Sequence, residues 1–273
     1  MGFSEAQIEN ISDDITFHFL HIDCIDENIA NLIEDTIVRI CRGPDFGEED
    51  KRDIKNTLIE KINSKKGDKL ELGLVSEFFI HLYLNYRGLS QEFLYFNLED
   101  QGGIKKGFDG VYSLGEDIWL MESKSGYFTT QSISHKNKIK EAYDDLSKKV
   151  SGRSTNTQGI KINPWYNAWN HAKTASSENK TLFQMIKTMD KNFDAGKFSQ
   201  IQDFNIIPCS TIFFDGKNEN EVKNRVEHYD VVFNEIGRWI LDKEIKKGQI
   251  ICFSQATIDL LLNYLIESNG AAE

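Results

Sequence analysis

Proline and cysteine are scarce in this chain, with 3 prolines and 4 cysteines among 273 residues. The cysteines, at positions 24, 41, 209 and 252, form no CxxC pair, which excludes a zinc ribbon and gives no sign of a disulfide framework. No apolar run in the sequence approaches the roughly 20 residues that span a bilayer. The acidic, polar start MGFSEAQIENISDD is unlike a signal peptide. We therefore expect a cytoplasmic protein that does not enter a membrane.

An excess of basic residues is also absent, because 43 acidic and 32 basic side chains give a formal net charge of -11. This balance excludes a general polyanion binder whose whole surface contacts nucleic acid. Hydrophobic residues make up 40% of the chain, which excludes wholesale disorder. Any contact with DNA or RNA is therefore expected to be local, or to depend on a partner.

The hydrophobic pattern predicts a mixed α/β core. Helical spacing predicts amphipathic helices at 27–40 and through Ile54, Leu58 and Ile62, whereas 69–86 is apolar almost all round and predicts a buried helix. A basic helix is expected at about 136–150, and His135 before it is expected to face solvent or contact a phosphate. Alternation and apolar runs predict strands at 15–20, 93–97, 108–114, 117–124, 206–214 and 250–254.

The expected organisation has three parts, packed as one compact domain. A strand and helices at 1–68 precede a core at 69–215, which contains an insertion at about 152–200. An extension at 216–273 follows, with helices of about 219–241 and 256–267 around the last strand. The core order is then helix, three strands, helix, strand.

One carboxylate falls in the middle of the predicted buried helix. Glu77 has apolar neighbours on both sides, and an isolated buried carboxylate would cost several kcal/mol. It is therefore expected to be paired, protonated or bound to a cation. A hydrogen bond to His81, one helical turn further on, is the simplest alternative.

Two further carboxylates are brought together by a predicted hairpin. Gly115-Glu116 fits a two-residue type II′ turn, which pairs Leu114 with Asp117 and so places Asp109 directly opposite Glu122. Like charges at this spacing repel, and a divalent cation between them would reverse the sign of the interaction. Lys124 lies two residues beyond Glu122 and so projects from the same face of the strand.

The bare pattern acid-x-Lys is weak evidence, because it occurs seven times in the sequence. Only the copy at Glu122 ends an apolar strand and has an acid placed across a hairpin. An exposed strand end with an ordinary Glu/Lys pair remains the alternative.

These residues resemble the PD-(D/E)xK nuclease superfamily. Its restriction-endonuclease-like core is α-β-β-β-α-β, with an acid on the first helix, an Asp on the second strand and (D/E)xK on the third. Glu77, Asp109, Glu122 and Lys124 fall on those places in that order, over about residues 69–215. Phe108 stands where the name of the superfamily has proline.

A narrower resemblance rests on GLVSEFFIHLYL, then KKGFDGVYSLGEDIWLMESKSG, then the basic helix. This combination is similar to the HamA-like nuclease subunit of Hachiman anti-phage defence, a family that degrades DNA together with a helicase. The resemblance implies a metal-dependent DNA endonuclease or exonuclease controlled by a helicase-like ATPase partner.

The resemblance also implies roles for individual residues. Asp109, Glu122, the main-chain carbonyl of Ser123 and Glu77 would bind Mg²⁺ or Mn²⁺, and Lys124 would orient the attacking water. A non-catalytic interaction module with the same fold is the alternative, although intact opposed charges favour the enzyme.

Two lysine clusters are candidates for DNA phosphate contacts, each against the alternative of an ordinary solvated charged face. Aromatic residues of the segment Trp165–Trp169 either stack on bases, form a surface for a partner or belong to the core. The candidate phosphate-binding lysines are Lys105, Lys106, Lys136, Lys138 and Lys140.

Overall fold

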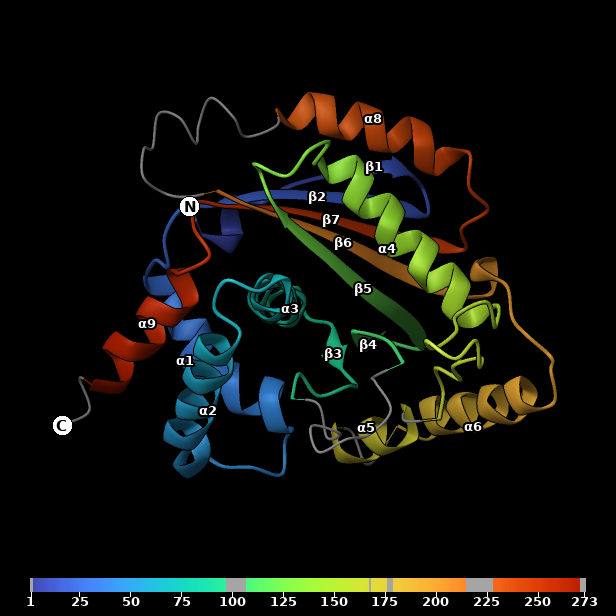
Figure 1. Cartoon of the computed structure of the whole chain (residues 1–273), viewed down its shortest axis with the longest axis horizontal. Coiled ribbons are helices and arrows are strands. Elements are labelled where there is room, and N and C mark those ends of the chain that lie inside the picture. The colour runs from blue at the N-terminus through green and yellow to red at the C-terminus, as the bar shows by residue number, and fades with distance from the viewer. Residues whose placement is uncertain (1, 97–106, 167, 176–178, 215–227, 271–273) are drawn as a thin grey trace.

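The computed structural model describes residues 2–96, 107–166, 168–175, 179–214 and 228–270, which form an α/β protein with a seven-stranded mixed sheet (Figure 1). The strands are β1 (Gln7–Ser12), β2 (Ile15–Ile22), β3 (Ser90–Gln91), β4 (Gly110–Leu114), β5 (Asp117–Tyr127), β6 (Asn205–Phe213) and β7 (Lys247–Gln255). The described α-helices are α1 (Glu27–Arg42), α2 (Lys51–Ser64), α3 (Lys69–Tyr86), α4 (His135–Val150), α5 (Ala168–Ala175), α6 (Lys180–Asp194), α8 (Tyr229–Leu241) and α9 (Leu260–Gly270). Short 3-10 helices are Phe3–Glu5, Glu48–Asp50 and Ile201–Asp203.

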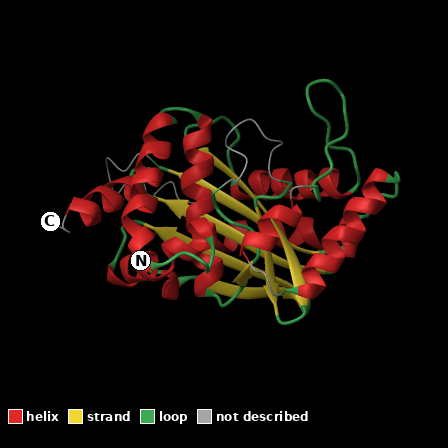
Figure 2. Ribbon diagram, turned by 90° about the horizontal axis from the view of Figure 1, so that it is seen from below, coloured by secondary structure: helices red, strands yellow, loops and turns green. Residues whose placement is uncertain are grey.

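Strands from both ends of the chain share one sheet with the middle strands. The strand order is β1-β2-β7-β6-β5-β4-β3. The four central strands β2, β7, β6 and β5 are parallel, and the pairs at both edges are antiparallel. Figure 2 shows helices on both faces of this sheet. Among the described helices, none has the length and apolar character needed to cross a bilayer.

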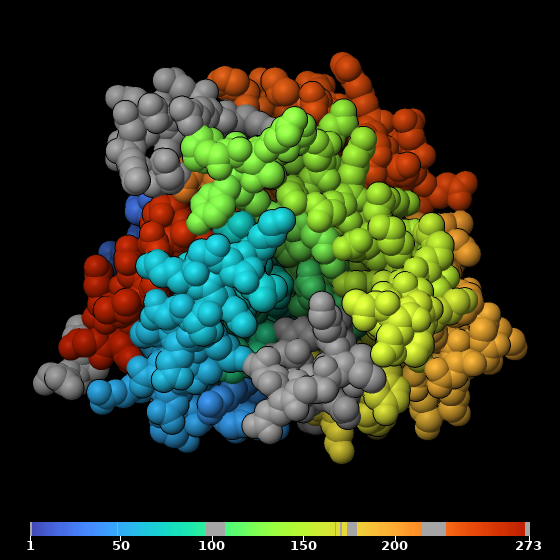
Figure 3. Space-filling view, viewed as in Figure 1, coloured from blue at the N-terminus to red at the C-terminus, as the bar shows by residue number. Residues whose placement is uncertain are grey.

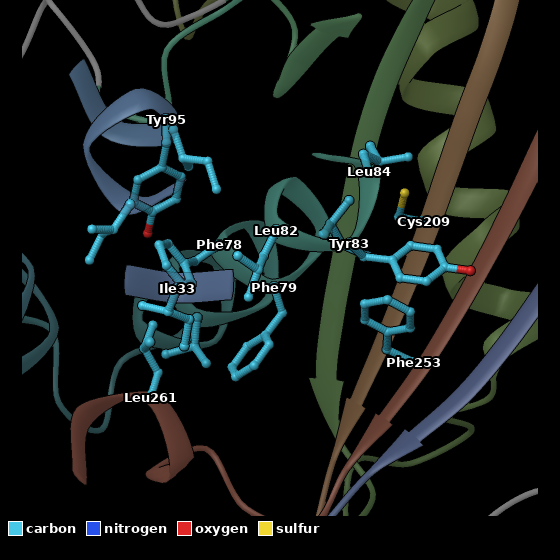
Figure 4. Packing of buried hydrophobic residues seen from close by; sticks show 14 of the residues in the cluster. Ile33, Phe78, Phe79, Leu82, Tyr83, Leu84, Tyr95, Cys209, Phe253 and Leu261 are labelled. Carbon is cyan, nitrogen blue, oxygen red and sulfur yellow. The ribbon is translucent and has the colours of Figure 1, made fainter. Parts of the chain in front are cut away.

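Helix α3 is buried, as its apolar sequence predicts. Tyr83 packs against Phe253 of β7 with ring centroids 5.2 Å apart, while Phe78 and Phe79 are fully buried. Figure 4 shows this cluster continuing away from the sheet to Leu261 of α9. The helix therefore lies between the sheet and an outer layer that includes α1 and α9, so its position is set from two sides.

The core order predicted from the sequence is confirmed as α3, β3, β4, β5, α4, β6, but the first strand was placed wrongly. Residues 93–97 were predicted as a strand, whereas β3 is only Ser90–Gln91, and the described residues 93–96 form bends. The backbone N–H groups of Tyr95 and Phe96 donate to the carbonyls of Ile40 and Cys41 at the end of α1. These N–H groups satisfy carbonyls that the end of a helix leaves unpaired. They are therefore not available for hydrogen bonds to a neighbouring strand.

The hairpin between β4 and β5 has the predicted register. Leu114 pairs with Asp117, and the ladder ends at Gly110 opposite Met121. Gly115 has φ +60°, which the first position of a type II′ turn requires. Asp109 and Glu122 lie one step beyond the end of the ladder, where this register places them.

Helix α4 covers the opposite face of the sheet from α3 (Figure 1). Its first residue, His135, is fully buried and bonds through Nδ1 to Ser210 of β6 at 2.9 Å and through Nε2 to Ser254 of β7 at 3.1 Å. The expectation that His135 faces solvent or a phosphate was wrong, because its ring fills the contact between the helix and two parallel strands.

Helix α5 was not predicted, and two further differences lie near the chain ends. Strand β1 was not predicted, because most of its residues are exposed and polar side chains interrupt its alternation. A helix was predicted over about 219–241, whereas α8 begins at Tyr229 after the extended residue His228, and 219–227 lie outside the described residues.

Candidate functional site

A pocket of about 520 Å³ lies beside the end of the β4–β5 hairpin. Glu77, Asp109, Glu122 and Lys124, the four residues that the sequence predicts as catalytic, all line it. They come from α3, the residue just before β4 and the middle of β5. Figure 3 shows the surface hollowed between the cyan atoms of α3 and the yellow-green atoms of the segment after α4. Tertiary packing has therefore brought together the four positions selected from the sequence.

Asp109 is held against the edge of β5. Its Oδ2 accepts a hydrogen bond from the backbone N–H of Ser123 at 2.8 Å. The N–H and C=O of one strand residue point to the same side, so the carbonyl of Ser123 points toward the same edge as the donor. Among the described residues, Asp109 Oδ1 has no hydrogen-bond partner, which leaves this oxygen available in the pocket.

Both carboxylate oxygens of Glu122 accept from lysine ammonium groups. Lys124 Nζ lies 2.9 Å from Oε1, and Lys149 Nζ lies 2.5 Å from Oε2. Glu122 is 2% exposed, so burial would make its charge costly without these partners. The repulsion with Asp109 expected from the sequence is therefore offset by two cations.

Asp145 and Lys149 of α4 belong to the site but were not predicted. Asp145 Oδ2 accepts from Lys124 Nζ at 2.7 Å, so Lys124 bridges two acids. The two α4 residues are spaced i, i+4 beside the buried Leu146 and Val150, which indicates that they flank the packed side of the helix. This spacing in the sequence indicates that Asp145 and Lys149 lie beside the buried face of the helix. The sequence alone does not show which strand residue that face contacts.

The charges in the pocket shift one another's titration. Burial and the nearby Asp109 raise the pKa of Glu122, while Lys149 and Lys124 act in the opposite direction. Burial lowers the pKa of Lys124 and of Lys149, but Glu122 and Asp109 outweigh burial and raise both values overall. Both lysines are therefore protonated at neutral pH.

Glu77 lies at the pocket from the other face of the sheet. It is half-buried rather than enclosed by the apolar residues of α3. His81, the alternative partner considered for it, is fully buried and hydrogen-bonds through Nδ1 to the hydroxyl of Tyr112. Burial raises the pKa of Tyr112 most strongly, and the neighbouring thiol of Cys209 and the carboxylate of Glu77 raise it further. Glu77 therefore acts electrostatically on the core beneath the pocket.

The insertion contributes to the position of Asp109. A Cβ atom on Gly107 would lie 1.8 Å from the carbonyl oxygen of Pro164, so only glycine allows this close approach. Trp165 is 2% exposed, and its ring lies 4.9 Å from that of Phe108. Trp165 is therefore a core residue next to Asp109, whereas Tyr166 and Trp169 are 60% and 41% exposed.

The lysines of α4 that were predicted to contact phosphates do not line this pocket. Lys136, Lys138 and Lys140 lie in the first turns of α4, about 13–20 Å along the helix axis from Lys149. Lys136 pairs with Glu235 at 3.7 Å and Lys138 with Glu141 at 2.8 Å. Lys105 and Lys106 lie outside the described residues. Contact of these lysines with nucleic acid stays a prediction.

The oxygen donors at the pocket match a hard cation such as Mg²⁺ in chemical type. Asp109 Oδ1 and the Ser123 carbonyl are donors of this kind, while Glu122 is shared with Lys124 and Lys149. In the described part of the chain, no three His, Cys, Asp or Glu side chains are arranged to hold a metal ion. A cation at Glu122 must therefore compete with two ammonium groups.

No protein-family model matches the chain, and a search of curated proteins found no match either. The functional conclusion therefore rests on the pocket and on the sequence motif.

Proposed function

We propose that this protein is a metal-dependent nuclease of the PD-(D/E)xK type that hydrolyses phosphodiester bonds in DNA. The observation that supports the proposal is the convergence of Glu77, Asp109, Glu122 and Lys124 on one pocket. The order α3, β3, β4, β5, α4, β6 also matches the restriction-endonuclease-like core. Asp109, Glu122 and Lys124 meet through the local hairpin register, whereas Glu77 reaches the same pocket from α3 through tertiary packing.

The side chains have distinct roles in this proposal. Asp109, Glu122 and the Ser123 carbonyl hold Mg²⁺ or Mn²⁺, and Glu77 contributes directly or through water. The bound cation neutralises the phosphate and lowers the pKa of the attacking water. Lys124, held by Glu122 and Asp145, orients that water and offsets the negative charge that develops on the phosphate.

The proposal includes a helicase-like ATPase partner in the cytoplasm and a role in anti-phage defence, as the resemblance to HamA-like proteins implies. The charge of -11 supports a partner that supplies nucleic-acid affinity. The ion pairs of three lysines also support such a partner. Lys124, Lys136 and Lys138 are each paired with an acid, which reduces their attraction for phosphates. These three lysines thus offer limited attraction for a long polyanion.

Plasmid nicking with Mg²⁺, Mn²⁺ or EDTA tests the proposal. We expect cleavage only with a divalent cation, and we expect Lys124→Ala to reduce the rate by about 100-fold or more through loss of charge stabilisation. Glu122→Ala should abolish cleavage and weaken Mn²⁺ binding. Lys187→Ala, an exposed lysine of α6, is the matched control and should cut like wild type.

Cleavage by Lys124→Ala at the wild-type rate would contradict the site assignment. Complete inactivity of the wild-type chain on plasmid and linear DNA, with its partner present, would instead favour the non-catalytic interaction module.

A further inference from the structure

Lys149 is a charged residue of the pocket to which the motif assigns no role. It lies in the last turn of α4, its side chain is 19% exposed, and its Nζ contacts Glu122 Oε2 at 2.5 Å. Within the described residues, Glu122 is the one carboxylate with which it forms an ion pair. An ammonium group so largely removed from water depends most on this contact, with Asp109 as a further, non-contacting negative charge.

Lys124 differs from Lys149 in this respect. Lys124 contacts Asp145 at 2.7 Å as well as Glu122 at 2.9 Å, so it keeps an acidic partner if Glu122 is engaged elsewhere. A divalent cation bound to Glu122 would neutralise the carboxylate charge that now balances the Lys149 ammonium group. The cation and the ammonium group would also repel each other, because both are positive and both would lie against Glu122.

We propose that Lys149 binds the substrate phosphate and thereby couples cation binding to nucleic-acid binding. This inference rests on the proposed nuclease function and adds a substrate contact to it. When a divalent cation engages Glu122, the phosphate of the bound strand replaces Glu122 as the counter-charge of Lys149. Cation and DNA therefore favour each other's binding, and linkage requires the two enhancements to be equal.

Substitution of Lys149 separates this role from a merely structural one. Lys149→Met removes the ammonium group that opposes the cation, while Lys124 still pairs with Glu122. Without DNA, the variant should bind Mn²⁺ more tightly than wild type, by about tenfold. A residue that only supported the fold would give weaker or unchanged binding when replaced. Lys149→Gln provides a second neutral side chain if the methionine variant is unstable.

The first measurement is a calorimetric Mn²⁺ titration of the full chain without DNA. The second is fluorescence anisotropy of a labelled DNA duplex with and without Ca²⁺, used in place of Mg²⁺ and checked for intact strands on a denaturing gel. Wild type should gain about tenfold in DNA affinity with the cation, and Lys149→Met should lose most of that gain. Lys149→Arg should retain it, and Lys148→Met, at a neighbouring lysine with 52% side-chain exposure, should match wild type.

Two results would overturn the role of Lys149. One is Mn²⁺ binding by Lys149→Met and Lys149→Gln that is no tighter than in wild type. The other is a cation-dependent gain in DNA affinity that survives in these variants. If wild type binds no divalent cation and cuts no DNA, the proposed function fails as well, so the two failures are distinguishable.

Discussion

At the scale of single residues, Glu122 decides the electrostatics of the pocket. The sequence places Glu122 opposite Asp109, so the two carboxylates are expected to repel each other. If Asp109 were its only charged neighbour, removal of the Glu122 charge would stabilise the fold. The structure adds Lys124 and Lys149, each in contact with one of its oxygens. Removing the charge of Glu122 relieves its burial and its repulsion with Asp109, but it leaves the Lys149 ammonium group without the carboxylate that it contacts.

We expect Glu122→Gln to lower the free energy of unfolding by about 3 kcal/mol, the range found when one partner of a buried pair is removed. Urea unfolding at neutral pH measures the change. Glu141→Gln is the control, because Glu141 is 50% exposed and pairs with Lys138 at 2.8 Å. That exposed pair should contribute less than about 1 kcal/mol. A Glu122→Gln protein as stable as wild type would show that the lysines do not depend on Glu122.

At the scale of elements, α4 connects the site to the parallel strands. Its first residue, His135, bonds to Ser210 of β6 and Ser254 of β7, and its last turn reaches Glu122 of β5 through Lys149. Ser134 caps the helix by accepting from the backbone N–H of Asn137 at 3.1 Å. The helix is thus anchored at both ends, so the position of Lys149 depends on contacts far from the pocket.

The anchor at His135 makes stability depend on pH. Burial lowers the pKa of His135 to about 3, whereas an unfolded histidine has a pKa near 6.5. Below pH 6.5 the unfolded chain takes up a proton that folded His135 does not, so stability falls as the pH falls toward 3. Between pH 7 and pH 5 this residue alone should account for a loss of about 2 kcal/mol.

Urea unfolding of His135→Gln at pH 7 and pH 5 tests this assignment. The loss of stability between the two pH values should be about 2 kcal/mol smaller than in wild type. His228→Gln, at the exposed residue before α8, should leave the wild-type loss unchanged. Equal losses in His135→Gln and wild type would mean that His135 is protonated in the folded protein.

At the scale of the whole molecule, the sheet unites three parts of the chain. β6 is buried along its full length and lies between β5 and β7, although β7 comes from the C-terminal part of the sequence. β7 pairs in turn with β2 from the N-terminal part. The segment 69–215, which contains the motif, therefore depends on neighbours from outside it.

We expect residues 69–215 expressed alone to be unfolded or insoluble, because β6 would become an exposed apolar edge and α3 would lose α1 and α9. The full chain should unfold in one cooperative transition. Circular dichroism and urea unfolding of both proteins provide the comparison. A fragment with its own cooperative transition would show that the motif segment is an independent folding unit.

The sequence by itself determined the local geometry of the site. The two-residue turn at Gly115 sets the β4–β5 register, because glycine accepts φ +60° and the pairing then follows by counting. Alternation along β5 places Glu122 and Lys124 on one face for the same local reason. The burial of α3 was also predictable, because its apolar residues surround the helix and leave no polar face for water.

Only the tertiary structure decided what these residues meet. The contact between Lys149 and Glu122 joins positions 27 apart and depends on how α4 packs on the sheet. The bends after β3 arise because the backbone N–H groups of Tyr95 and Phe96 donate hydrogen bonds to carbonyls at the end of α1. The apolar pattern of the sequence does not reveal that these carbonyls compete with strand pairing. Local sterics and side-chain period fix short-range geometry, whereas distant contacts depend on which faces of the elements are buried together.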